Sequence, residues 1–180
     1  MIFNPLMLRK AGVVEMLEAI YHRRSVRRFL PEALTEETVT ALLKAACAAP
    51  SAHHLRPWRF VVVDSQEKMR GMLDIHSHME MLRTAPTAII VCGDSTVSPD
   101  FWPDDCAAAT ENMVIAAEIL GLGSFWCAVY PRVERMEEFV QLFSLPEGIK
   151  PYSVLAVGKP AEPKIQAERF KQELIHRNQW

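Results

Sequence analysis

Apolar residues along the chain alternate between helical spacing and short continuous runs. Thr35 has the pattern of a helix N-cap, because Glu36 and Glu37 follow it in the first turn, where the helix dipole favours acidic side chains. Spacing of three to four residues predicts helices over residues 13–21, 36–46, 69–76, 104–120 and 133–143. Continuous apolar runs predict strands, buried on both faces, at 60–63, 88–92, 125–129 and 153–157. These elements predict a layered sheet flanked by helices.

The helix predicted over residues 104–120 carries one narrow charged stripe. Asp104, Glu111 and Glu118 fall seven residues apart on an otherwise largely apolar cylinder. Such a helix must be covered on most sides, so we expect it at the centre of the fold. Gly121 and Gly123 follow it and are expected to end it and to permit close packing.

Length and composition are those of a small globular protein. The 180 residues correspond to about one domain, residues 1–180, with 49% hydrophobic and 23% charged residues. Twenty Lys and Arg residues against twenty-two Asp and Glu residues give a formal charge of −2, so no nucleic-acid partner is expected. Because no apolar stretch approaches the ~20 residues of a bilayer span, no membrane partner is expected either.

The chain ends and the cysteines indicate a compartment. Residues 1–10 place a basic pair after the apolar part, the reverse of a secretory signal, so a cytoplasmic location is expected. The four cysteines form no CxxC pair, and Cys92 and Cys127 lie in apolar runs as small hydrophobes, so disulfides are not expected in a reducing cytoplasm. Residues 160–180 begin Pro-rich and become polar; with little core of their own, they are expected to lie on a neighbouring subunit.

Residues 23–28 place four arginines and a serine in six positions. One interpretation is a cationic helix C-terminus that complements the macrodipole, although two cations would suffice for that. The other is a phosphate site, because the rigid guanidinium fork and a compact hydroxyl both suit phosphate oxygens. The residues alone leave both interpretations open.

A polar loop with the sequence PSAHHLRPW, residues 50–58, leads into the first predicted strand. Its two prolines, its serine and its adjacent histidines could line a pocket. A plain connection between a helix and a strand, with an exposed histidine, is the alternative.

Two further motifs are interpreted as structural. The segment Gly121-Leu122-Gly123-Ser124 follows a helix and opens a strand, the reverse of the dinucleotide-binding order, and it lacks the third glycine. His76 and His78 are predicted to point to different faces of one helix, without a Cys or carboxylate set to complete a metal site. No metal is therefore expected, and no Ser-His-Asp arrangement is visible.

Taken together, these motifs resemble the nitroreductase family of FMN-dependent NAD(P)H oxidoreductases over about residues 14–180. The resemblance rests on the order and spacing of RRSVRRF from Arg23, the PSA…PW loop from Pro50, DDCAAATENMVIAAEILGLGSFW from Asp104 and GKPAEPK from Gly158. It implies an α+β sandwich with a mixed central sheet flanked by helices, in an intertwined homodimer with FMN at the subunit interface. The helix from Asp104 would form much of the dimer core, and residues 160–180 would wrap the partner subunit.

The resemblance also implies which residues bind the FMN phosphate and the flavin edge. Arg23, Ser25 and Arg169 match contacts to the ribityl phosphate, with Arg24 contributing through its backbone or side chain. Arg27 matches the basic position that faces the pyrimidine edge of the flavin, where it would stabilise developing negative charge.

Further flavin contacts implied by the resemblance are Pro50, Ser51, Ala52 and His54 from the other subunit, and the backbone of Ala128 and Val129. The loop departs from the family pattern, which resembles PSAxNxQPW, because His54 and Arg56 replace the usual Asn and Gln. His54 can still donate or accept a hydrogen bond. Arg56 adds a positive charge near the pocket mouth, which favours an anionic substrate.

The reaction implied by the resemblance is ping-pong transfer of hydride from NADH or NADPH, through flavin N5, to a small acceptor such as a nitroaromatic or quinone. The cofactor carries this chemistry, so no protein nucleophile is needed and no catalytic side chain is assigned. Two alternatives are open. One is other flavin chemistry within the family, such as dehalogenation, flavin fragmentation or enone reduction, and the other is a non-catalytic flavin-binding protein.

Overall fold

The computed structural model of the protein describes residues 13–163 and 168–180, with side chains from Leu17 onward. Residues 1–10 and Lys164 of the GKPAEPK segment, which the sequence interpretation used, lie outside this range. The helices are α1 (Val13–His22), α2 (Glu36–Cys47), α3 (Gln66–Ile75), α4 (Trp102–Ile119) and α5 (Val133–Phe143). The strands are β1 (Trp58–Val63), β2 (Thr87–Asp94), β3 (Gly123–Ala128) and β4 (Ile149–Gly158). Short 3₁₀ segments cover Ala52–His54, Ser77–Arg83 and Gln172–Leu174.

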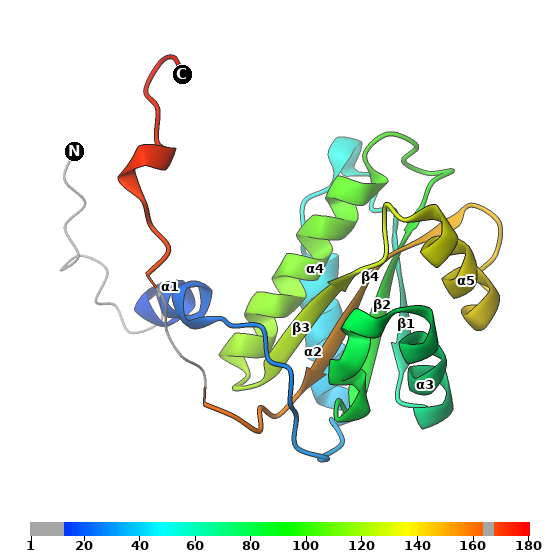
Figure 1. Cartoon of the computed structure of the whole chain (residues 1–180). Coiled ribbons are helices and arrows are strands. Elements are labelled where there is room, and N and C mark those ends of the chain that lie inside the picture. The colour runs from blue at the N-terminus through cyan, green and yellow to red at the C-terminus, as the bar shows by residue number, and fades with distance from the viewer. Residues whose placement is uncertain (1–12, 164–167) are drawn as a thin grey trace.

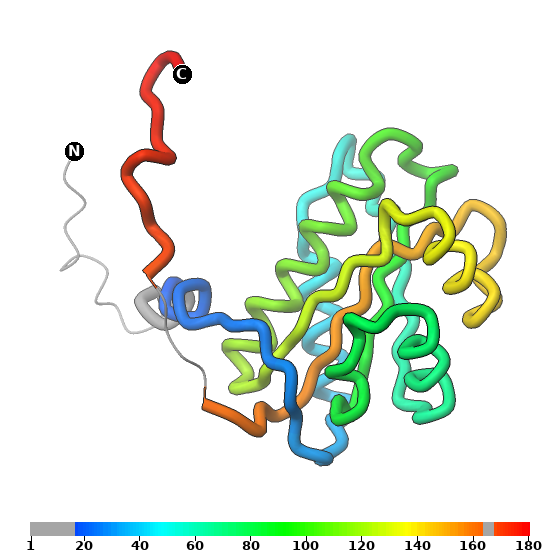
Figure 2. Tube along the Cα trace, viewed as in Figure 1, coloured from blue at the N-terminus to red at the C-terminus, as the bar shows by residue number. Residues whose placement is uncertain are grey.

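The strands form one sheet in the order β1-β2-β4-β3, and every neighbouring pair is antiparallel. The α+β fold class is confirmed. The resemblance implied a mixed sheet, but among the described residues the parallel pairing is limited to one isolated bridge, between Ser25 and Ser124. Strands β1 and β3 therefore lie at the two edges of the sheet. The segment that joins α1 to α2 passes the edge formed by β3 (Figure 2).

Helices cover both faces of the sheet (Figure 1). On one face, Met69 and Met72 of α3 and Phe139 of α5 are fully buried. On the other face, Leu42 of α2 and Met113 of α4 are fully buried. The unbroken apolar strands follow from this arrangement, since a strand packed on both sides has no solvent face to alternate with.

Helix α4 has the charged stripe and the burial that its sequence predicts. Asp104 and Glu111 of the stripe are exposed and Glu118 is half-buried, whereas the opposite positions are buried against α2 and the sheet. Leu120 caps the helix and Gly121 follows with φ +71°, a left-handed conformation that glycine adopts without steric cost. A Cβ on Gly123 would lie 2.7 Å from Cγ2 of Val26, so this glycine permits close packing, as the sequence predicts.

The N-cap and the ends of the helices also follow from local chemistry. The Thr35 side chain accepts a hydrogen bond from the backbone N–H of Thr38 at 3.3 Å, which confirms the predicted cap of α2. Helix α3 ends at Ile75, and His76 has extended backbone angles. The prediction that His76 and His78 point to different faces of one helix is therefore wrong. The two imidazole rings make an edge contact, with 5.0 Å between their centroids.

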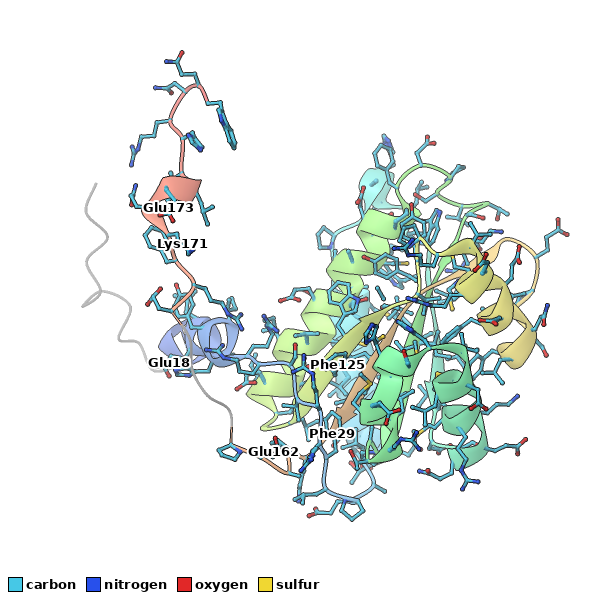
Figure 3. All side chains as sticks on the ribbon, viewed as in Figure 1. Glu18, Phe29, Phe125, Glu162, Lys171 and Glu173 are labelled. Atoms are coloured by element: carbon cyan, nitrogen blue, oxygen red, sulfur yellow. The ribbon has the colours of Figure 1, made fainter. Side chains whose placement is uncertain are left out.

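Residues 168–180 extend away from the sheet (Figure 1), and Lys171 and Glu173 mark this tail in Figure 3. Every residue of this segment is exposed in the single chain. Its packing on a partner subunit, like the single-domain organisation, stays a prediction. Among the residues that the structure describes, no helix combines the length and the apolar character needed to cross a bilayer.

Candidate functional site

The outer edge of β3 carries polar backbone groups that no neighbouring strand covers. The Ser124 carbonyl accepts from the Val26 backbone N–H at 2.9 Å, and the Ala128 carbonyl accepts from Nη1 of Arg135 at 2.7 Å. Alternate residues of a strand present their backbone groups to the same side, so the peptide groups of Trp126 also face this edge. Residues 23–28 run beside this edge, with Ser25 bridging Ser124 and Arg27 lying over the ring of Phe125.

Two distant parts of the sequence meet at the end of α1. Nη2 of Arg169 lies 3.5 Å from the carbonyl oxygen of Arg23, although 146 positions separate the two residues. Both side chains line a pocket of about 610 Å³ with Glu111 and Glu168. Partial desolvation, followed by the charges of Arg24 and Arg23, lowers the pKa of Arg169. Three guanidinium groups thus lie close enough to repel one another, and an anion bound among them would relieve that repulsion.

Arg24 partly fulfils the alternative interpretation of the arginine cluster. Its Nη1 donates to the carbonyl of Tyr21 at 3.0 Å and to that of Arg23 at 2.7 Å, so it satisfies backbone acceptors at the C-terminus of α1. This geometry uses one of the four arginines for helix capping. Arg23, and Arg169 from the tail, remain the side chains that line the pocket.

Arg27 occupies a different pocket on the other side of the same segment. Its Cζ lies 4.9 Å from the ring centroid of Phe125, a cation–π distance, and Figure 3 shows Phe125 on β3. The two side chains line a pocket of about 630 Å³ with His78 and Arg83. Ser25, which lies between Arg23 and Arg27 in sequence, is exposed and bridges Ser124. The segment therefore has donors that suit a phosphate, Arg23 and Ser25, at one end. At its other end, the cation of Arg27 lies beside the aromatic ring of Phe125.

The loop at residues 50–57 is held by a small set of hydrogen bonds. The Ala52 backbone N–H donates to Oδ1 of Asp105 at 2.8 Å, and the Arg56 backbone N–H donates to the Ser51 hydroxyl at 3.0 Å. His53, His54 and Arg56 all have positive φ, which is uncommon for residues other than glycine. Ser51 and Ala52 are half-buried, while Pro50 and residues 53–56 are exposed. The loop is thus an anchored turn that presents its basic side chains to solvent.

His54 and Arg56 form a side-chain pair. Nη2 of Arg56 and Nε2 of His54 are within hydrogen-bond distance, although both side chains are exposed. Arginine can only donate, so Nε2 of His54 is the acceptor in this contact. The two residues that depart from the family pattern therefore act together, with His54 orienting the guanidinium of Arg56.

The structure does not bring the loop and the arginine cluster together within one chain. The loop lies beside the N-terminal end of α4, where it contacts Asp105, whereas α1 lies beside the C-terminal half of that helix (Figure 1). Among the described residues, no hydrogen bond joins the loop to Arg23 or Arg169. Their meeting across a subunit interface stays a prediction.

Ala128 and Val129 differ in how far their backbone groups are engaged. Ala128 is exposed, and its carbonyl accepts from Arg135. Val129 is buried; its N–H donates to the Tyr152 carbonyl at 2.9 Å, and its carbonyl accepts from the Arg132 N–H at 3.3 Å. Of these two residues, Ala128 is therefore the one that is exposed at the edge of β3.

Sequence interpretation missed two contributors, Asp105 and Arg135. In the sequence, Asp105 has no motif of its own and stands beside the solvated stripe that Asp104 and Glu111 form on α4. A signal was available, since Ala109 and Met113, four and eight residues further along, are apolar and share the phase of Asp105. Arg135 lies on α5 without any local motif, so only the folded chain shows that it contacts β3.

Three of the four cysteines lack the character of nucleophiles. All four are free thiols, and Cys92, Cys106 and Cys127 are buried. Burial raises the pKa of Cys92 to about 12 and that of Cys106 further still. A buried thiol with a raised pKa is not a thiolate at neutral pH. No group of three or more potential metal ligands occurs in the described part of the chain.

Comparisons with known proteins agree on one family. The model of the nitroreductase family matches residues 20–79 and 76–159. A Methanothermobacter thermautotrophicus protein, provisionally named NADH dehydrogenase/NAD(P)H nitroreductase, is 40% identical over 173 residues, covering 95% of this chain and 91% of its own. A Parabacteroides distasonis structure with the same provisional name is 36% identical with a TM-score of 0.90, covering 92% and 99%. A Desulfovibrio desulfuricans structure, provisionally named a nitroreductase and solved in complex with FMN, is 27% identical with a TM-score of 0.79, covering 92% and 97%.

Proposed function

Because the chain belongs to the nitroreductase family, we propose that it oxidises NADH or NADPH and reduces a small acceptor such as a nitroaromatic or a quinone, with FMN as its cofactor. The relatives support the electron donor and the cofactor, since one carries NAD(P)H in its name and another was solved with FMN. The acceptor and the ping-pong order belong to the proposal alone.

The observation that carries the proposal is the arginine cluster at the end of α1. Arg23 and Arg169 line one pocket, and the pKa of Arg169 is lowered first by partial desolvation and then by the charges of Arg24 and Arg23. A phosphomonoester fits this donor set, because guanidinium groups bind phosphate oxygens in a fork and the nearby Ser25 adds a hydroxyl donor. We therefore assign the FMN phosphate to Arg23, Ser25 and Arg169, with Arg24 beside them.

When bound, FMN supplies N5 as a hydride acceptor and donor and thus carries the redox chemistry. The residues of this chain would position the flavin ring and polarise it. Arg27 holds a positive charge against Phe125, where it would stabilise negative charge on the pyrimidine edge of a bound flavin. Ala128 lies exposed at the open edge of β3, where its backbone, with the carbonyl already accepting from Arg135, would lie beside the flavin ring. The buried, protonated thiols take no part.

The proposal includes a homodimer, because one chain separates the groups that the site needs. Large apolar side chains are exposed on both α1 and the tail. The exposed fraction is 61% for Tyr21, 66% for Phe170 and 69% for Leu174. Exposed apolar side chains that recur along two neighbouring segments mark an interaction surface. A partner subunit that covers them would bring its own 50–57 loop to the arginine cluster.

The test is the visible absorption spectrum of the purified protein under anaerobic conditions, before and after NADH and then NADPH. We expect flavin bands that bleach with at least one donor and return when a nitroaromatic or quinone is added. Bands that persist with both donors would favour the non-catalytic alternative. Absence of flavin bands even after incubation with FMN would refute the proposed cofactor site. A panel including halogenated aromatics and enones separates the remaining flavin chemistries.

A further inference from the structure

Asp105 is a buried carboxylate that the proposed function leaves without a role. It lies in the first turn of α4 and is only 4% exposed. Among the described residues it forms no ion pair with Lys, Arg or His, so its charge is met by hydrogen bonds. The donors are the backbone N–H of Ala52, at 2.8 Å from Oδ1, and the hydroxyl of Ser98, at 3.5 Å from Oδ2. Burying a carboxylate in this way is costly unless such donors are held in place.

The shorter of these two bonds connects α4 to the 50–57 loop. Ala52 opens a 3₁₀ turn directly before His53 and His54, which both have positive φ. Side chains other than glycine avoid this conformation, so a free loop of this sequence would relax away from it. The loop has a second constraint of its own, the bond from the Arg56 N–H to the Ser51 hydroxyl. Among the described residues, the Asp105 bond is the hydrogen bond that connects the turn to α4, and the His53 ring adds an edge contact, 6.1 Å between centroids, with Phe101 at the start of that helix.

We propose that Asp105 is a positioning residue that fixes the 50–57 loop in the geometry with which it contacts the flavin. This inference rests on the proposed function, since the loop is the part of the site that the partner subunit would contribute. A charged acceptor makes a stronger bond to a backbone N–H than a neutral one does. The bond therefore holds Ala52, and the His54–Arg56 pair after it, at a constant distance from α4.

The neighbouring residue offers a matched control. Asp104 has the same charge in the same helical turn but is exposed, and no hydrogen bond joins it to the loop among the residues that the structure describes. Asp105→Asn keeps an oxygen that can accept from the Ala52 N–H, and its amide can donate to the Ser98 oxygen. Asp105→Ala removes both. This series separates three effects. Asp105→Ala removes the hydrogen bond, Asp105→Asn removes the charge alone, and Asp104→Ala removes a carboxylate from the same end of the helix.

The experiment measures four quantities on each holoprotein. They are the FMN dissociation constant, the hydrogen-exchange rate of the Ala52 amide, and kcat and KM for one acceptor. We expect Asp105→Ala to weaken FMN binding and to speed Ala52 exchange by about tenfold or more, with KM rising more than kcat falls. Asp105→Asn and Asp104→Ala should stay within about threefold of the parent in both binding and exchange.

Loss of stability is controlled by a core variant remote from the loop. Phe139→Leu destabilises the opposite face of the sheet, where Phe139 is fully buried, and should leave FMN affinity unchanged while the protein is folded. If Asp105→Ala binds FMN as tightly as Phe139→Leu, or if Ala52 exchange is unaltered, the positioning role is refuted. If the parent protein binds no FMN, the proposed function fails instead. The exchange rates then still decide whether Asp105 holds the loop.

Discussion

Arg169→Ala tests the phosphate site where two distant segments of the chain meet. Among the described residues, Nη2 of Arg169 donates one hydrogen bond, to the Arg23 carbonyl at 3.5 Å, and partial desolvation followed by the charges of Arg24 and Arg23 lowers the pKa of Arg169. The side chain therefore adds little to the fold and is repelled by its neighbours. We expect an unchanged thermal midpoint, within about 2 °C, because an exposed side chain with one long contact contributes little to stability.

The effect on ligand binding should be much larger. A guanidinium that donates to a phosphate dianion makes charge-assisted bonds, and their loss should raise the FMN dissociation constant by about tenfold to a hundredfold. Arg23→Ala should act in the same direction. Because both residues serve one anion and repel each other without it, the double variant should lose less than the product of the two single losses.

The assay is titration of the apoprotein with FMN, followed by quenching of flavin fluorescence at two salt concentrations. Lys171→Ala is the matched control, since it removes an exposed cation two residues further along the tail. We expect the parent to lose affinity as salt increases and Arg169→Ala to lose less. A dissociation constant for Arg169→Ala within twofold of that for Lys171→Ala would mean that the arginines of this pocket do not bind the phosphate.

Three further predictions follow from single features of the structure. Arg56→Ala should raise KM for an anionic acceptor several-fold more than for its neutral analogue, because it removes the cation of the His54–Arg56 pair; equal losses would contradict this. Gly123→Ala should lower the free energy of unfolding by about 1–3 kcal/mol in urea titrations, since its Cβ would lie 2.7 Å from the Val26 side chain. A thiol reagent at pH 8 should modify exposed Cys47 but not Cys92, whose pKa is raised to about 12, and rapid labelling of Cys92 in the native state would refute its burial.

The helices and strands were predictable because each buries an apolar stripe or run that is visible in the sequence. The cap at Thr35 and the left-handed Gly121 were predictable from local chemistry, without knowledge of the fold. The extended backbone of His76, which ends α3 at Ile75, was not predictable in this way. Whether a chain leaves a helix one residue earlier depends on the packing of the following turn, and Met79 and Met81 of that turn are buried in the core.

The arginine cluster was predictable in composition but not in arrangement. The composition of residues 23–28 indicates a cationic site. The sequence does not show which of these arginines contact the end of the helix and which line the pocket. In the structure Arg24 donates to the carbonyls at the end of α1, while Arg23 lines the pocket with Arg169. The resemblance to a family supplied Arg169, because a single arginine in a polar tail has no periodicity or neighbour that would single it out.

Asp105 shows why a residue type alone is a poor guide to its role. Asp104 and Asp105 are adjacent and chemically identical, and only the 100° rotation per residue of an α-helix separates them. That rotation places Asp104 in solvent and Asp105 against the loop, where one carboxylate oxygen meets the Ala52 N–H. A charged residue in phase with buried neighbours must find donors inside the protein, and those donors identify the segment that it holds. Helical phase therefore indicates that Asp105 has an internal partner, and the fold is needed to show that the partner is the 50–57 loop.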